Sequence, residues 1–143
     1  MFANVIIHDP YLREHWLHKN FPIVNPLSLA AAQAAYQHGQ AWLDQLSDYL
    51  DDNFNFLQHF LQQHLPQAQF IIPESTYLAW IDVSDYFSPD QNLTRFFAEK
   101  AGVLLEGGNM FVDNADGFIR LNLACPRSKI EQALLKIKAS IIT

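Results

Sequence analysis

Residues 117–124 read GFIRLNLA, and in this stretch apolar side chains alternate with polar ones on either side of Arg120. A period of two is typical of a β-strand with one buried face. A little further on, Ser128 and Glu131 form the pattern of a capping box, which begins a helix. The apolar residues of that helix recur at helical spacing: Ile130, Leu134, Ile137 and Ile141. The chain is therefore predicted to end in a strand followed by an amphipathic helix.

Three more strands and a helix are predicted upstream of this pair. Residues 69–72 and 76–83 are rich in β-branched and aromatic residues and predict two strands, and residues 103–105 predict a third, short one. Between them, a capping pattern at Ser88 predicts a helix over 89–101. The resulting order is β-β-α-β-β-α. This order predicts an α/β sandwich whose helices cover one face of a largely antiparallel sheet.

The N-terminal half predicts mostly helix, beginning with a short one over 11–19. Asn25 and Pro26 are a favourable N-cap and first helical residue for a second. Apolar residues at three- and four-residue spacing then predict one long helix over 40–64. Such a helix is about 37 Å long, which suits an element that spans two domains. Residues 3–7 predict a buried strand without a neighbouring partner, which indicates that residues upstream complete its sheet.

The composition is typical of a globular protein. Of the 143 residues, 50% are hydrophobic and 17% are charged, and the formal net charge is −6 with histidine neutral. Because the chain is acidic and has no run of lysine and arginine, neither nucleic acid nor a membrane is an expected partner. The single cysteine, Cys125, excludes an intrachain disulfide. No apolar stretch approaches the roughly 20 residues of a membrane span, so we expect a cytoplasmic protein.

Arg120 is the most informative polar residue, because it lies within a predicted strand between apolar neighbours. Its planar guanidinium suits bidentate binding of a carboxylate. Alternatively, it pairs with an Asp or Glu across the sheet or faces solvent. The segment Gly107-Gly108-Asn109 indicates either a turn or a loop whose amides bind an anion. No His, Cys and carboxylate set has metal-ligand spacing, so no metal site is expected, and Cys125 is expected to be a buried packing residue.

Four segments, taken in order, resemble one enzyme family. Residues 117–127, GFIRLNLACPR, resemble the stretch G-F-x-R-x-N-x-A-C-P-R near the C-terminus of MalY/PatB-type cystathionine β-lyases and aminotransferases, which are fold-type I pyridoxal-phosphate enzymes. Residues 35–43, AYQHGQAWL, are similar to A-Y-x-x-G-x-x-W-L, and residues 73–82, PESTYLAWID, are similar to P-E-x-T-Y-L-x-W-x-D. Residues 107–111, GGNMF, lie where the family has P-G-x-x-F-G, with Gly in place of Pro and Val112 in place of the final Gly.

The resemblance covers nearly the whole chain and implies that Arg120 binds the α-carboxylate of an amino-acid substrate. The reaction it implies is β-elimination of a thiolate from cystathionine or a related amino acid, with transamination as the neighbouring outcome. Gly107, Gly108 and Asn109 would belong to a possible active-site loop.

The resemblance also assigns several residues to structural roles. Asn122 and Arg127 match the motif around Arg120 and are expected to support the fold. Tyr77 and Trp80 are expected to pack in the core of the small domain.

The cofactor implied by the resemblance is pyridoxal 5′-phosphate, which such enzymes hold as a Schiff base with a lysine. The resemblance places that lysine before Met1, and none of the five lysines of this chain has an equivalent setting. We therefore expect no catalytic residue in this chain, no cofactor bound by the chain alone, and no activity of the isolated chain.

Three segments follow from this interpretation: residues 1–24 as a remnant of the large cofactor-binding domain, 25–65 as interdomain helices and 66–143 as the small C-terminal α/β domain. The missing large N-terminal domain is then the main partner, and the complete enzyme is expected to be a homodimer. Two alternatives stay open from the residues themselves. One is a non-catalytic protein-interaction module, and the other is an amino-acid-binding module that uses Arg120.

Overall fold

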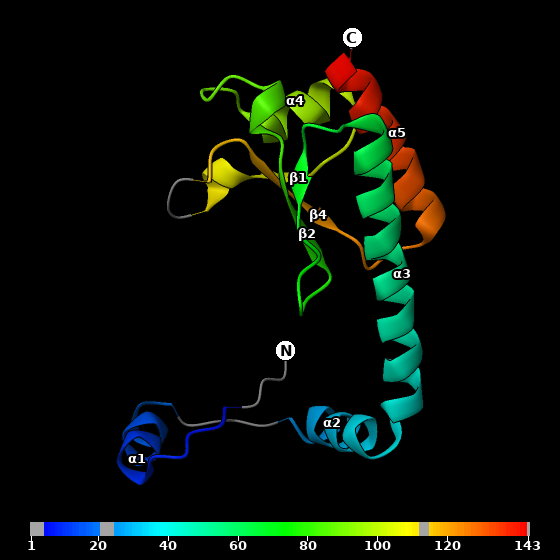
Figure 1. Ribbon diagram of the computed structural model, residues 1–143. Helices are drawn as coiled ribbons and strands as arrows, with labels where there is room; N and C mark the ends of the chain where they lie inside the picture. Colours follow the sequence, from blue (N-terminus) through cyan, green and yellow to red (C-terminus); the bar gives the residue numbers. More distant parts are fainter. Residues whose placement is uncertain (1–4, 21–24, 112–114, 143) are drawn as a thin grey trace. The chain divides into compact units, whose positions relative to one another are not determined.

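The structure is a computed structural model that describes residues 5–20, 25–111 and 115–142 (Figure 1). The chain divides into two compact units, Met1–Leu46 and Ser47–Thr143, and the division falls within the long helix α3. The predicted segment boundaries after residues 24 and 65 stay a prediction. Among the described residues, no helix combines the length and the apolar character that crossing a membrane requires.

The first unit contains helices α1 (Pro10–Lys19) and α2 (Pro26–His38). Both begin with a side-chain cap followed directly by proline, as the sequence predicts for the second. The Oδ1 atoms of Asp9 and Asn25 each accept a hydrogen bond of 2.9 Å from a backbone N–H of the first turn. No described residue of this unit is buried. The described residues of this unit thus have local caps but no buried core, and short helices ordinarily depend on tertiary packing for most of their stability.

The strand predicted over residues 3–7 is not formed in the part that the structure describes. Ala3 and Asn4 lie outside the described residues, and Val5–Ile7 belong to no strand. Val5 and Ile6 are 53% and 79% exposed. A strand needs a neighbour to satisfy its backbone groups, and no described strand of this chain pairs with these residues.

The long helix α3 spans Gln40–His64, with the bounds that the sequence predicts. Only its C-terminal half contains buried residues, and Trp42 in its first turn is 68% exposed. The buried side chains recur at three- and four-residue spacing: Asn53, Phe54, Leu57, Phe60 and Leu61. The apolar side chains of α3 thus form one continuous stripe along the helix, but only those in its C-terminal half pack in the core of this chain.

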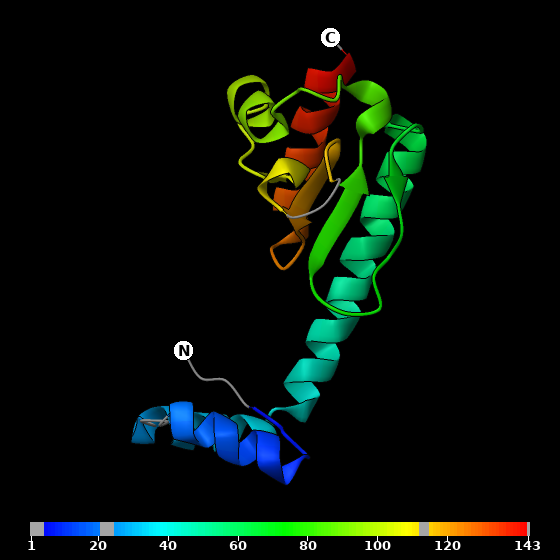
Figure 2. The ribbon, with the colours of Figure 1, turned by 90° about the vertical axis from the view of Figure 1, so that its left-hand side faces the viewer.

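The second unit is built on a four-stranded antiparallel sheet of order β1-β2-β4-β3. The central pair, β2 (Leu78–Asp82) and β4 (Phe118–Asn122), is flanked by the two-residue edge strands β1 (Gln69–Phe70) and β3 (Glu106–Gly107). Figure 2 shows the sheet in front of α3 and the C-terminal helix, which is coloured orange to red. The predicted α/β fold with a largely antiparallel sheet is confirmed.

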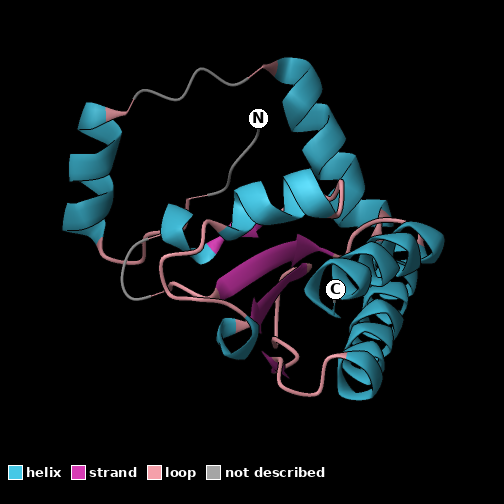
Figure 3. Ribbon diagram, turned by 90° about the horizontal axis from the view of Figure 1, so that it is seen from above, coloured by secondary structure: helices cyan, strands magenta, loops and turns pink. Residues whose placement is uncertain are grey.

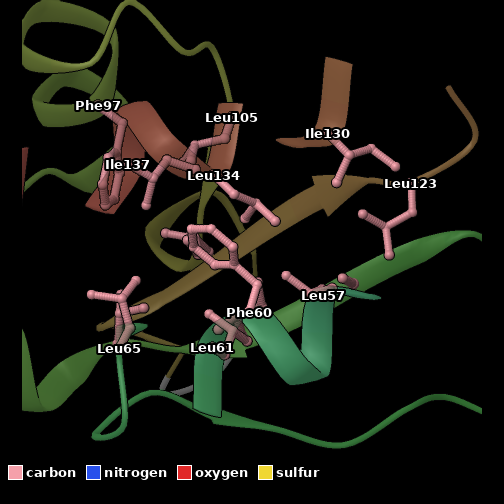
Figure 4. Close-up of a cluster of buried hydrophobic side chains, with 14 of the residues drawn as sticks. Leu57, Phe60, Leu61, Leu65, Phe97, Leu105, Leu123, Ile130, Leu134 and Ile137 are labelled. Carbon is pink, nitrogen blue, oxygen red and sulfur yellow. The ribbon is translucent and has the colours of Figure 1, made fainter. Parts of the chain in front are cut away.

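One face of the sheet packs against α3 and the last helix, α5 (Arg127–Ile142), which lie on the same side of it (Figures 1 and 3). The side chains that α5 buries are Ile130, Leu134 and Ile137, and Ile141 is half-buried. Figure 4 shows how side chains from α3 and α5 converge in this core with Phe97, Leu105 and Leu123. Each fully buried Leu or Ile contributes about 1.5–3 kcal/mol, so the core holds the second unit together. Its strand members are Ala79, Ile81 and Ile119, all 0–1% exposed.

The helix predicted over 89–101 begins later than the sequence pattern indicates. Helix α4 spans Leu93–Lys100, and its N-cap is Asn92, whose Oδ1 accepts a hydrogen bond of 2.9 Å from Arg95 N–H. Ser88 instead accepts from Gln91 N–H at its carbonyl oxygen in a turn. The prediction at Ser88 was wrong because two capping patterns lie four residues apart, and packing of the helix selects the second. The buried members of α4 are Leu93 and Phe97.

Other boundaries differ from the prediction as well, and β1 and β2 are shorter than the strands predicted over 69–72 and 76–83. The short strand expected over residues 103–105 is formed instead by Glu106–Gly107, because these two residues pair with β4. Helix α5 begins at Arg127, so Ser128 lies inside its first turn and does not cap it from outside. Two single-turn 3-10 helices complete the second unit: η1 (Ser84–Tyr86) and η2 (Gly108–Met110).

Candidate functional site

The sheet face opposite α3 and α5 presents a charged pair among aromatic side chains. Successive residues of a strand point to opposite faces, so the neighbours of buried Ile119 point away from the core. The register places Arg120 of β4 opposite Trp80 of β2 on one side and Glu106 of β3 on the other. We call these residues, together with the aromatic residues that contact them, the open-face cluster: Trp80, Glu106, Phe111, Phe118 and Arg120.

Arg120 pairs with Glu106 across the two strands. Its Nε donates a hydrogen bond of 2.5 Å to Glu106 Oε2, and its Nη2 forms an ion pair with the same oxygen. The Arg120 side chain is 29% exposed and that of Glu106 is 43% exposed. Of the alternatives that the sequence left open, cross-strand pairing is the one this structure contains. It engages one edge of the guanidinium, so pairing and ligand binding do not exclude each other.

Aromatic rings hold the guanidinium of Arg120 in place. Its Cζ lies 4.6 Å from the centroid of the Phe111 ring, a cation–π contact. The Trp80 ring meets Phe111 edge-on, with centroids 5.2 Å apart, and stacks on Phe118 at 5.5 Å. A guanidinium flanked in this way loses little additional freedom when it binds a ligand.

The Arg120 side chain lies in an open depression of about 520 Å³. Residues from four segments line it: Tyr77, Leu78, Thr94, Leu104, Leu105, Glu106, Met110, Arg120 and Asn122. Several of these are large apolar side chains that remain exposed, including Leu104 at 86% and Met110 at 59%. Apolar walls around a few polar groups are typical of small-molecule sites.

The prediction that Tyr77 and Trp80 pack in the core was wrong. Tyr77 is 47% exposed and lines the depression, and Trp80 is 36% exposed in the open-face cluster. Residues three apart in a strand point to opposite faces, so Tyr77 and Trp80 could not both face the core, and Tyr77 lies before β2 begins. Cys125, predicted to be buried, is half-buried against the core.

In the loop Gly107-Gly108-Asn109, close backbone packing requires a glycine at position 108. Both glycines are buried, and Gly107 N–H donates a hydrogen bond of 2.8 Å to Thr94 Oγ1. A Cβ at Gly108 would overlap the carbonyl oxygen of Ala115. The loop thus has a structural reason for its second glycine, and it connects β3 with Phe111 beside Arg120.

Arg127 has the structural role expected of it. Its Nε donates a hydrogen bond of 2.6 Å to Oδ1 of the fully buried Asn53, and its Cζ lies 4.8 Å from the centroid of Phe56. Asn53 Nδ2 in turn donates to the carbonyl oxygen of Leu123 (2.9 Å). This network attaches the turn after β4 to α3, and so it holds the C-terminal end of the strand that contains Arg120. Asn122 also stabilises this turn, since its Oδ1 accepts from Ala124 N–H at 2.8 Å.

The arrangement is suited to binding a carboxylate, and it contains no amine that could hold an aldehyde cofactor. A guanidinium matches a carboxylate through paired N–H donors. The five lysines lie in α1, α4 and α5, and none of them lines the depression around Arg120. Among the described residues, no group of three or more His, Cys, Asp or Glu side chains is placed to hold a metal ion. The lining of this depression by itself therefore offers no lysine for pyridoxal phosphate.

Comparison with known proteins relates this site to one kind of enzyme. No family model matches the chain. The chain is 35% identical over 118 residues to cystathionine beta-lyase PatB of Bacillus subtilis (strain 168), a match that covers 82% of this chain and 30% of that protein. It is 39% identical over 108 residues to protein MalY of Escherichia coli (strain K12), covering 76% of this chain and 28% of that protein. The chain thus spans about 30% of the length of these curated relatives.

The fold leads to the same group. The solved structure of the pyridoxal-phosphate-bound C-S lyase from Staphylococcus hominis matches with a TM-score of 0.90 and 47% identity, over 96% of this chain and 37% of that one. The chain therefore shares the fold of the corresponding part of these neighbours, which are fold-type I pyridoxal-phosphate enzymes. More particularly, the chain matches the C-terminal part of the cystathionine β-lyases of the PatB and MalY type.

Proposed function

We propose that this chain supplies the substrate-carboxylate site of a pyridoxal-phosphate-dependent C–S β-lyase, or of a closely related aminotransferase. The observation that supports it is the position of Arg120. Its guanidinium projects from the central strand β4 into the depression on the open face of the sheet. In the complete enzyme, Arg120 binds the α-carboxylate of an amino acid such as cystathionine.

Binding at this position orients the substrate as well as retaining it. A charge-assisted hydrogen bond contributes about 1.5–3 kcal/mol, and the second bond of a bidentate pair adds geometric specificity. Leu104 and Met110 provide apolar surface beside the guanidinium, which excludes water from part of the contact. The segment Gly107-Gly108-Asn109 borders the same site and holds Phe111 against Arg120.

Other parts of the enzyme supply the rest of the active site in this proposal. A lysine from a large N-terminal domain holds pyridoxal 5′-phosphate, whose ring supplies the electron sink for C–S bond cleavage. The isolated chain binds no cofactor and is inactive, because that lysine is not among its own. The complete enzyme is a homodimer of the cytoplasm. The exposed apolar side chains of the first unit fit contact with the large domain: Val5, Ile6, Leu27, Leu29, Tyr36, Trp42 and Leu43.

The test is replacement of Arg120 in the complete enzyme. Arg120→Ala is expected to lower kcat/KM for cystathionine by about 10²-fold or more, the equivalent of losing a charge-assisted contact of about 3 kcal/mol. Visible absorbance of the bound cofactor should stay as in the parent enzyme, since Arg120 contacts only the substrate.

Arg95→Ala is the matched control for this test, because Arg95 is an exposed arginine of α4 whose partner is Glu99. It should leave the kinetics unchanged. A value of kcat/KM in Arg120→Ala equal to that of the control would refute the assignment of Arg120.

A further inference from the structure

Glu106 occupies one of the two edges of Arg120 at which a carboxylate can bind. A guanidinium offers two edges for bidentate binding, and they share one nitrogen, Nη2. Glu106 Oε2 contacts both Nε and Nη2 of Arg120. The Phe111 ring lies against one face of the same guanidinium. Because Nη2 donates a separate N–H to each edge, an incoming carboxylate either takes the second edge beside the negative charge of Glu106 or displaces Glu106 from the first.

Glu106 is held only by its strand position and by Arg120. It lies on the two-residue edge strand β3, and its side chain is 43% exposed. Within the described part of the chain, Arg120 is the only cation that pairs with it. Rotating this side chain into solvent breaks one partly exposed ion pair and disturbs no core packing. Such pairs contribute little net stability, so a ligand can displace the Glu106 side chain.

We propose that Glu106 is an intramolecular competitor at the carboxylate site, whose side chain a ligand carboxylate displaces from Arg120. This inference rests on the proposed function, because it takes Arg120 as the carboxylate receptor. In the empty site, Glu106 neutralises Arg120 and keeps its guanidinium against Phe111. When a ligand carboxylate arrives, the two carboxylates repel each other, and the affinity of the site is lower than that of an unpaired arginine. Glu106 thus sets how strongly the site binds carboxylates.

The test measures carboxylate binding at Arg120 directly in the 143-residue chain. The chain has four arginines, Arg13, Arg95, Arg120 and Arg127, so the ¹H–¹⁵N signals of their Nε–H groups are few. The Arg120→Lys variant assigns the signal of interest by its loss. Sodium acetate is the probe, and sodium chloride titrated to the same ionic strength is subtracted as background. The backbone amide signals of β4 report whether each variant is folded.

In Glu106→Gln, the Arg120 Nε–H signal is expected to respond to acetate with about a fivefold lower apparent Kd, since a repulsion of about 1 kcal/mol is removed. Glu106→Ala should lower the Kd as well. This second variant is included because the amide of a glutamine at position 106 could itself form a hydrogen bond with Arg120, whereas alanine cannot. The matched control is Glu99→Gln, because Glu99 pairs with Arg95 through the same kind of contact, Nε to Oε1 at 2.8 Å. It should leave the acetate response of Arg120 unchanged.

The outcomes separate this inference from the proposal on which it rests. An Arg120 signal that responds to acetate equally in the parent and in both Glu106 variants, or more weakly in the variants, overturns the role of Glu106 and leaves the carboxylate site standing. An Arg120 signal that responds in none of the folded proteins overturns the carboxylate site itself, and the competitor role with it.

Discussion

Replacing the buried Asn53 by alanine is expected to destabilise the second unit by about 3 kcal/mol. Asn53 is fully buried in α3 and forms three hydrogen bonds. Its Nδ2 donates to the carbonyl oxygens of Leu123 (2.9 Å) and Cys125 (3.4 Å), and its Oδ1 accepts from Arg127 Nε (2.6 Å). These contacts attach the turn between β4 and α5 to the helix that packs beneath the sheet.

The magnitude follows from the groups that alanine would leave without a partner. Cys125 keeps an acceptor contact with Tyr49 Oη at 3.5 Å, so the loss there is small. The carbonyl oxygen of Leu123 and the Nε of Arg127 each lose a short bond, and each such loss costs about 1–3 kcal/mol in a buried setting. The shorter side chain also leaves a small cavity, which acts in the same direction.

Urea unfolding followed by far-UV circular dichroism measures this difference. Since no described residue of the first unit is buried, the cooperative transition should report the second unit. The matched control is Asn55→Ala, because Asn55 is an exposed asparagine on the same helix. Its unfolding free energy should change by less than about 0.5 kcal/mol.

The reasoning is refuted if Asn53→Ala and Asn55→Ala unfold at the same urea concentration with equal slopes. That result would mean that the turn after β4 is held by the strand and the helix alone. A reduced slope in Asn53→Ala would instead show that the native state has loosened, and the free energy would then be taken from hydrogen exchange of the β4 amides.

Two further substitutions test backbone geometry by the same urea assay. Gly108→Ala should lower the free energy of unfolding by about 2 kcal/mol or more, because the new Cβ would overlap the backbone carbonyl of Ala115 and the loop must shift. Gly102→Ala should lower it by only about 1 kcal/mol, because Gly102 has a φ of +61° but open space around it. Equal losses in the two variants would contradict the overlap argument. Thr76→Gly should raise the free energy of unfolding by up to about 1 kcal/mol, because Thr76 is a β-branched residue at φ +75°. The control Ser75→Gly, at the neighbouring position, should leave the free energy of unfolding unchanged or lower it. A loss of stability in Thr76→Gly would show that Thr76 adopts its conformation without strain.

Local sequence patterns predicted the elements more reliably than their ends. The bounds of α3 were predicted correctly because its apolar residues keep helical spacing over 25 residues. Over that length, one apolar residue that falls in place by chance has little effect on the predicted ends. The start of α4 was wrong because Ser88 and Asn92 both have the character of an N-cap, and only the second leads into residues that pack on the sheet. The position of β3 was predicted wrongly because the strand has only two residues, too few to show an alternation of apolar and polar side chains.

The candidate site was predicted in part. Arg120 was identified because a charged residue in an apolar strand needs a partner and because its motif resembles that of a known family. Glu106 was missed, since the sequence does not state which strand lies beside β4 or in which register. Trp80 was assigned to the wrong face for a related reason, because a period of two identifies two faces without saying which one the helices cover, and Tyr77 lies before the strand begins.

The sequence by itself determined the α/β class, the long helix, the antiparallel character of the sheet and the candidacy of Arg120. These follow from periodicity, caps and residue chemistry, which act over a few neighbouring residues. Only the tertiary structure decided the strand order β1-β2-β4-β3, the pairing of Arg120 with Glu106 and the burial of Asn53 beneath the turn after β4. Those contacts join residues 14 and 70 positions apart, and no local pattern encodes them because they form only when the sheet and helices pack together.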